Sequence, residues 1–194
     1  MSDRLYVQYG CGTCAPAAWR NFDISLRLRL EKVHGLRAVF RCTVGLLFPR
    51  NASFGDILRG LPVPEGSASG VYCSHVLEHL ALDELPLALR NTLRLLRPGG
   101  IFRLVVPDLH WRAIRYVAAV ANGEPFAADQ FMSSTNLGRS FKPKNIVGIA
   151  RECFGHSAHL WMYDFASLKA KLEDVGFVEI RRCELGDATD RMFD

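Results

Sequence analysis

Residues 74–108 constrain the fold of this chain most, because they have the pattern of a parallel strand–helix–strand unit. After a strand-like end at His75, leucines recur at helical spacing until Arg-Pro-Gly-Gly at 97–100 ends the helical pattern. The apolar run 101–106 then has the composition of a strand covered on both faces, and Asp108 follows it. His75 and Asp108 are therefore expected at the carboxyl ends of strands, where open parallel sheets bind ligands.

The rest of the chain alternates between strand and helix patterns. Strands are predicted at 5–9, 19–24, 52–57, 71–75, 101–106 and 177–183. Helices are predicted at 25–44 with a break near Gly35, at 85–96, from a cap at Asp108 to 121, and from a cap at Asp164 to a stop at Gly176. The helix that begins at Asp108 is expected to turn Trp111, Ile114, Val117 and Ala121 inward. This alternation predicts a doubly wound, mostly parallel α/β sheet.

Length and composition are those of one globular domain. The chain has 194 residues, of which 49% are hydrophobic and 23% charged, and its net charge of +4 is spread along the sequence. That charge permits an anionic ligand without indicating nucleic acid, and no apolar run is long enough for a membrane span. Without the pattern of a signal peptide, the expected compartment is the cytoplasm. Residues 122–162 break the alternation and are expected to form a lid or insert, with one helix after Pro143.

Six cysteines are present, and only Cys11 and Cys14 form a Cys-x-x-Cys pair. A structural zinc site needs a second pair or closely spaced histidines, so we interpret the cysteines as reduced and mostly buried thiols. His75 and His79 are four residues apart, as zinc-protease ligands are, but Glu78 is out of order for His-Glu-x-x-His. We therefore expect no metal here, with Glu78 and His79 on the first turn of a helix.

Candidate ligand-binding residues follow the predicted strands. Gly10-Cys11-Gly12 is a glycine turn after the first strand, although it lacks the third glycine of a dinucleotide site. Asp23 ends the second strand, where a carboxylate can accept ribose hydroxyls, and Asp56 ends the third. Taken singly, each residue is equally well explained as a turn or a helix cap.

Taken together, these motifs resemble small class I S-adenosylmethionine-dependent methyltransferases. The resemblance is carried by the glycine turn, the strand-end acids, His-Val-Leu-Glu-His at 75–79, Pro-Gly-Gly at 98–100 and Val-Pro-Asp at 106–108. The resemblance implies a Rossmann-like sheet of six or seven strands with a shortened first strand–helix unit, and S-adenosyl-L-methionine as cofactor. It places Gly10, Cys11 and Gly12 at the methionine moiety, Asp23 at the ribose, Asp56 and Ile57 near the adenine, and Ser74 and His75 at the methionine part.

The resemblance also implies methyl transfer to an acceptor, expected to be a small molecule and not a nucleic acid. A base is needed only for a poor nucleophile such as a hydroxyl, and the candidates are His75, Asp108 and His159. Tyr163 is a further group that could reach an acceptor. The alternative is a methyltransferase-like module that binds a partner without catalysis. The sequence identifies neither the acceptor nor the oligomeric state.

Overall fold

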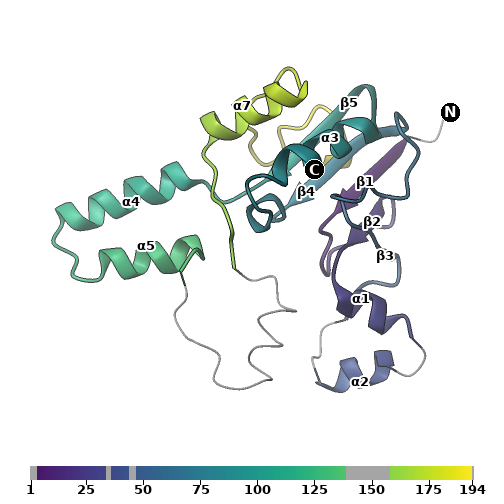
Figure 1. Ribbon diagram of the computed structural model, residues 1–194, viewed down its shortest axis with the longest axis horizontal. Helices are drawn as coiled ribbons and strands as arrows, with labels where there is room; N and C mark the ends of the chain where they lie inside the picture. The colour runs from purple at the N-terminus through teal and green to yellow at the C-terminus, as the bar shows by residue number, and fades with distance from the viewer. Residues whose placement is uncertain (1–3, 34–35, 44–46, 139–157, 194) are drawn as a thin grey trace. The chain divides into compact units, whose positions relative to one another are not determined.

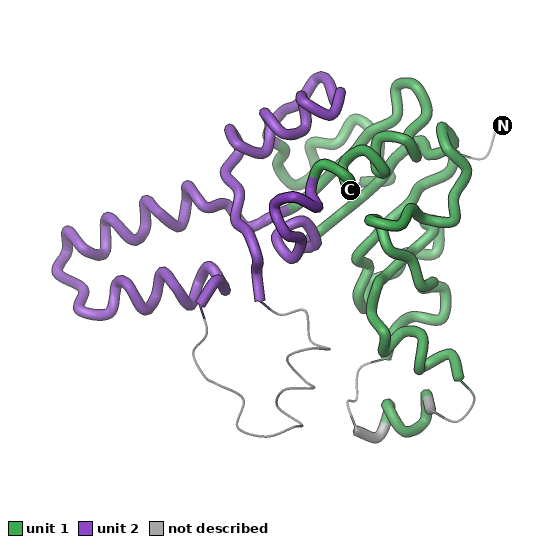
Figure 2. The backbone as a smooth tube through the Cα atoms, viewed as in Figure 1, with its two compact units in different colours: residues 1–74, 86–105, 183–194 green, residues 75–85, 106–182 purple. Residues whose placement is uncertain are grey.

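The computed structural model describes residues 4–33, 36–43, 47–138 and 158–193. The chain forms two compact units (Figure 2). Unit 1 comprises Met1–Ser74, Pro86–Val105 and Cys183–Asp194, and unit 2 comprises His75–Leu85 and Val106–Arg182. The strands of the sheet belong to unit 1, and the second half of the central motif, beginning at His75, belongs to unit 2.

Unit 1 is built on a five-stranded sheet in the order β3-β2-β1-β4-β5, and all of its neighbouring strands are parallel (Figure 1). The strands are β1 (Leu5–Tyr9), β2 (Arg20–Asp23), β3 (Ala52–Phe54), β4 (Ala68–Ser74) and β5 (Leu96–Val105). Its helical elements are α1 (Leu26–Glu31), α2 (Leu36–Thr43), α3 (Leu85–Leu95) and the 3-10 turn η2 (Arg191–Phe193). The first residue of α3, Leu85, is assigned to unit 2. The predicted parallel α/β sheet is confirmed.

The central strand β1 is covered on both faces, as its apolar sequence predicts. On one face, the Tyr9 hydroxyl lies 3.1 Å from the Thr92 hydroxyl of α3, and both side chains are buried. On the other face, the Tyr6 ring packs against Trp19, with ring centroids 5.2 Å apart, and against Phe193 of η2. Side chains from distant parts of the chain therefore close the core around β1.

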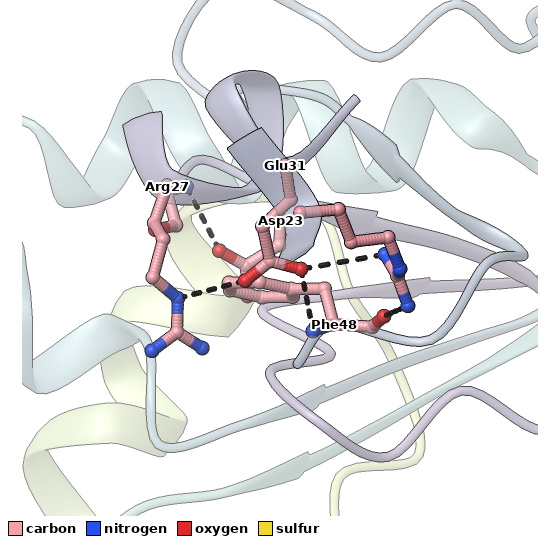
Figure 3. Close-up of polar contacts among 6 residues, drawn as sticks. Asp23, Arg27, Glu31 and Phe48 are labelled. Atoms are coloured by element: carbon pink, nitrogen blue, oxygen red, sulfur yellow. Dashed lines mark hydrogen bonds and ion pairs between the residues drawn. The ribbon is translucent and has the colours of Figure 1, made fainter. Parts of the chain in front are cut away.

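A buried carboxylate joins α1 to the segment that precedes β3. The Glu31 side chain is fully buried, and its Oε2 accepts a hydrogen bond of 3.0 Å from the Phe48 backbone N–H (Figure 3). Arg27 lies 3.2 Å from Oε1 and Arg37 lies 3.4 Å from Oε2, while Arg37 also donates to the Phe48 carbonyl. These contacts hold the Phe48 ring in a small buried cluster with Leu28.

The predictions for the outer part of the sheet are partly wrong. β5 was expected to be covered on both faces, but Ile101 is 37% exposed and Val105 is 39% exposed. Residues 177–183 form no strand, because Glu179 has a left-handed backbone (φ 55°) that interrupts an extended segment. The described parts of the chain therefore contain five strands of the predicted six or seven.

Unit 2 contains η1 (Leu77–His79), α4 (Leu109–Ala121), α5 (Ala127–Thr135) and α7 (Phe165–Val175). The predicted caps are confirmed. The Asp108 carboxylate accepts hydrogen bonds from the His110 and Trp111 N–H groups at the start of α4, and Asp164 forms a capping box with Ser167 at the start of α7. Gly176 ends α7 in a left-handed conformation (φ 111°). α4 and α5 run side by side (Figure 1), and the Tyr116 and Phe131 rings meet between them.

The predicted orientation of α4 is wrong. No residue of α4 is buried, and Trp111, Ile114 and Val117 are each more than half exposed. Within the predicted insert, α5 forms where no helix was expected, and the helix predicted after Pro143 lies outside the described residues. None of the helices described in either unit has the length and apolar character needed to cross a bilayer.

Substitution of Gly55 by alanine is expected to lower the free energy of unfolding by about 1–3 kcal/mol, as overpacking does. An added Cβ would lie 2.8 Å from atoms of both the Phe22 and Leu61 side chains, which are themselves buried. Gly138→Ala is the matched control, because its Cβ would meet only the end of the flexible Met132 side chain. Urea unfolding of both variants tests this. Equal effects would contradict the packing argument.

Candidate functional site

A turn with two left-handed glycines follows β1. Gly10 has φ 67° and Gly12 has φ 50°, and residues with a Cβ adopt such values only at a cost in conformational energy. No atom lies within 4 Å of the position that a Cβ on Gly12 would occupy. At Gly12 the backbone of this turn therefore leaves room for close approach by a ligand.

Asp23 holds the glycine turn in place from the end of the neighbouring strand. Its Oδ2 accepts a hydrogen bond of 2.8 Å from the Gly12 N–H, and its Oδ1 accepts one of 2.8 Å from the Ser25 N–H. Each carboxylate oxygen has a second lone pair, so two further donors can still be accepted. Asp23 therefore orders the turn and retains the capacity to bind a pair of hydroxyl groups.

Cys11, between the two glycines, turns its side chain into the core. The thiol is buried with Leu28, Phe48 and Ala52, and burial, assisted by the charge of Asp23, raises its pKa to about 12. The Cys11 N–H donates to the Phe22 carbonyl, and its own carbonyl accepts from Cys14. Cys11 thus shapes the turn through its backbone and its packing, and its thiol stays protonated.

Brief alkylation of the native protein with iodoacetamide is therefore expected to modify Cys14, which is exposed, and to spare Cys11. Peptide mass spectrometry measures the extent at each position. In denaturant the two thiols should react at similar rates. Modification of Cys11 at the rate of Cys14 in the native protein would contradict its burial.

Asp56 and Ile57 lie in the loop that follows β3. Asp56 accepts a hydrogen bond from the Leu58 N–H and pairs with Arg59 at 3.4 Å. The Asn91 side chain donates to the backbone carbonyls of Ile57 and Leu58, at 2.7 and 3.2 Å, and fixes the loop to α3. Sequence reasoning did not identify Asn91, although an amide among the leucines and arginines of this helix was a usable signal.

The strand order brings these residues to one edge of the sheet. β1 lies between β2 and β4, so the chain moves outward from β1 in one direction through β2 and β3 and in the other through β4 and β5. This is the switch point of an open parallel sheet, where ligands bind beyond the carboxyl ends of the strands. In unit 1 the glycine turn, Asp23 and Ser74 follow or end the three central strands, and Asp56 follows β3.

His75 begins unit 2 with a left-handed backbone (φ 53°), which is uncommon for residues other than glycine. Its Nδ1 lies 2.9 Å from Oε1 of Glu78, and its side chain is 60% exposed. Glu78 and His79 lie in the short 3-10 turn η1, before α3 begins at Leu85, and the Glu78 side chain is fully buried. A backbone strained in this way is typical of a functional position.

The other two predicted catalytic residues also lie in unit 2. Asp108 caps α4 and pairs with Arg182 at 3.5 Å. His159 is buried, and its Nδ1 has no hydrogen-bond partner among the described residues. Burial lowers the pKa of His159, and the negative charge of Glu78 offsets part of this effect. Tyr163 is fully buried, and burial raises its pKa to about 12.

Comparison with solved structures finds methyltransferases among the similar folds. A possible histamine N-methyltransferase from Thermotoga maritima is 14% identical, with 90% of this chain and 64% of that chain covered and a TM-score of 0.46. A methyltransferase from Archaeoglobus fulgidus is 16% identical, with 94% and 66% covered and a TM-score of 0.49. A putative methyltransferase from Haloferax volcanii, in complex with the Trm112 methyltransferase activator, is 17% identical, with 90% and 61% covered and a TM-score of 0.47.

The chain spans somewhat less than two thirds of the length of each of these three proteins. No curated protein matches it. The sequence itself matches the family described as "Methyltransferase domain" over residues 7–104, which begin in β1 and end in β5. This match covers half of the chain and includes every residue placed at the carboxyl edge of the sheet. The chain therefore belongs to the methyltransferase-domain family, and the predicted family and its cofactor, S-adenosylmethionine, are confirmed.

Proposed function

We propose that the protein transfers a methyl group from S-adenosylmethionine to a small-molecule acceptor. The observation that carries this proposal is the Asp23 carboxylate, which orders an open glycine turn at the switch point of the sheet. A carboxylate with free lone pairs beside such a turn fits a nucleoside with two ribose hydroxyls. The match to the methyltransferase-domain family supports the same function.

Each predicted binding residue has a role in this proposal. The backbone at Gly10 and Gly12 lies against the methionine moiety, and Asp23 accepts the ribose hydroxyls. Asp56 and Ile57 line the adenine side, in a loop that Asn91 holds rigid. Ser74 and His75 complete the methionine side at the end of β4. Cys11 supports this site through packing.

When bound, the cofactor would supply an activated methyl group for transfer to the acceptor. The chain's own contribution is to align the two reactants and exclude water, which supplies much of the acceleration. For a hydroxyl acceptor we propose His75 as the base, because Glu78 orients its Nδ1 and leaves Nε2 available. Asp108 and His159 remain weaker candidates, since Asp108 is paired with Arg182 and His159 is buried.

Two measurements test the proposal. Titration calorimetry with S-adenosylhomocysteine is expected to show one site per chain. Incubation with methyl-labelled S-adenosylmethionine and a small-molecule extract is expected to yield a labelled product identified by mass spectrometry. Absence of binding to both cofactor forms would overturn the proposal.

A second candidate is a module with this fold that binds a partner without catalysis. The observation that favours it is the short connection from β1 to β2, in which residues 10–19 form turns and no helix. The glycine turn therefore lacks the partial positive charge that a following helix would bring. Absence of detectable S-adenosylhomocysteine binding by the folded wild-type chain would support this second candidate.

A further inference from the structure

A compact group of potential metal ligands lies within unit 2. Glu78, His79 and His159 each offer one ligand atom, and these atoms all lie within 4.8 Å of one another. Glu78 and His159 are buried and His79 is partly buried. Of the His75 and His79 pair considered from the sequence, only His79 belongs to the set. The second histidine of the set, His159, comes from a segment about 80 positions further along the chain.

The hydrogen bonds of the three side chains leave one unpaired atom on each. His79 uses Nδ1 on the Ala158 carbonyl, at 3.0 Å, which leaves Nε2. Glu78 uses Oε1 on His75, and its buried Oε2 has no partner within the described chain. The His159 ring interacts with the Thr135 backbone, and its buried Nδ1 is likewise unpaired. Buried polar atoms without partners are uncommon in proteins, and a bound ion or water is one explanation for them.

Backbone hydrogen bonds hold the two contributing segments together. The Leu160 and Trp161 N–H groups both donate to the Glu78 carbonyl, at 2.7 and 3.1 Å. The His159 N–H donates to the carbonyl of Asn136 at the end of α5. The positions of the ligands are therefore set by the backbone before any ion binds, which reduces the ordering that binding requires.

We infer that Glu78, His79 and His159 bind a divalent transition-metal ion, with Zn²⁺ as the fitting species and one coordination position left for water or a ligand. Two imidazoles and one carboxylate form a ligand set typical of such ions, and three protein ligands with an open position are typical of non-structural zinc sites. Zn–N and Zn–O bonds of about 2.0–2.2 Å require ligand atoms about 3.5 Å apart, so small side-chain rotations complete the site.

The surroundings are those that orient metal ligands. A ligating histidine usually donates its other ring N–H to a backbone carbonyl, as His79 does to Ala158. His75 supports Glu78 in the same way.

The test uses the full chain after chelation and dialysis. Titration with Co²⁺ is expected to give one equivalent of a tetrahedral ion with visible ligand-field bands, and Zn²⁺ should displace it. Glu78→Gln, His79→Gln and His159→Gln should each weaken Co²⁺ binding by more than about tenfold, since even outer-shell partners contribute about 10–100-fold. His110→Gln, which alters an exposed histidine on α4, is the matched control and should bind as the wild type does.

Circular dichroism and thermal unfolding show whether each variant is folded. His79 is the least buried ligand, so His79→Gln is the variant that decides the matter where the other two fail to fold. Loss of binding in folded His79→Gln with binding retained in His110→Gln supports the site. Failure of the wild type to bind one equivalent of Co²⁺, a cobalt–thiolate charge-transfer band, or unchanged binding by folded His79→Gln would overturn it. None of these readouts depends on methyl transfer.

Discussion

Asp23→Ala is expected to weaken the binding of S-adenosylhomocysteine by about 100-fold or more. A hydrogen bond to a charged group contributes about 1.5–3 kcal/mol, and the proposed ribose contact has two of them. The substitution also removes the acceptor for the Gly12 and Ser25 N–H groups, so the turn that should contact the methionine moiety loses its support. Titration calorimetry measures the change directly.

Two further variants separate these effects. Asp23→Asn keeps one acceptor oxygen and the side-chain shape, so its loss of affinity should fall between the wild type and Asp23→Ala. Asp129→Asn on α5 removes an exposed carboxylate outside the sheet and should leave binding unchanged. Thermal unfolding confirms that each variant is folded. Wild-type affinity in a folded Asp23→Ala protein would remove the basis of the proposed cofactor site.

The central strands and their parallel direction could be predicted from the sequence because the signals are local. The glycine turn after β1, the Asp108 cap and the Asp164 to Gly176 helix are each defined by residues within a turn or two of one another. Asp23 ends β2 as predicted, and β4 ends at Ser74, one residue before the predicted end at His75. Their placement on one edge then followed from the parallel alternation of strands and helices.

What covers an apolar face could not be predicted. The periodicity of α4 correctly identifies Trp111, Ile114 and Val117 as one side of a helix, but these side chains are exposed. Residues 177–183 have a composition typical of a strand, yet Val178 is 81% exposed and Glu179 is left-handed. A strand requires a neighbouring strand with free backbone groups, and no local pattern states whether that neighbour is present.

The group of Glu78, His79 and His159 likewise could not be predicted from the sequence. Spacing along the chain brought only His75 and His79 into consideration, and with Glu78 out of order no metal was expected there. The structure instead brings His159 to Glu78 through backbone hydrogen bonds from Leu160 to the Glu78 carbonyl. Contacts made across about 80 residues depend on packing and leave no periodic signal in the sequence.

Glu31→Ala is expected to lower the free energy of unfolding by about 2–4 kcal/mol, the largest effect on stability that we predict. The substitution leaves the Phe48 N–H buried without its acceptor and removes the shared partner of Arg27 and Arg37 (Figure 3). Both arginines are about one-third exposed or less and can turn toward water, which keeps the loss below that for a fully buried pair. Urea unfolding measures the change.

Glu173→Ala is the matched control, because Glu173 also lies on a helix and pairs with a cation, Lys169, but is half exposed. Exposed pairs of this kind contribute about 0–1 kcal/mol, so the two glutamates should differ clearly in effect. Glu31→Gln keeps an acceptor for the Phe48 N–H and loses only the charge, so it should destabilise less than alanine does. Equal loss of stability in Glu31→Ala and Glu173→Ala would show that the buried Glu31 carboxylate is not what joins α1 to Phe48. The buried cluster of Cys11, Leu28, Phe48 and Ala52 would then depend on other contacts.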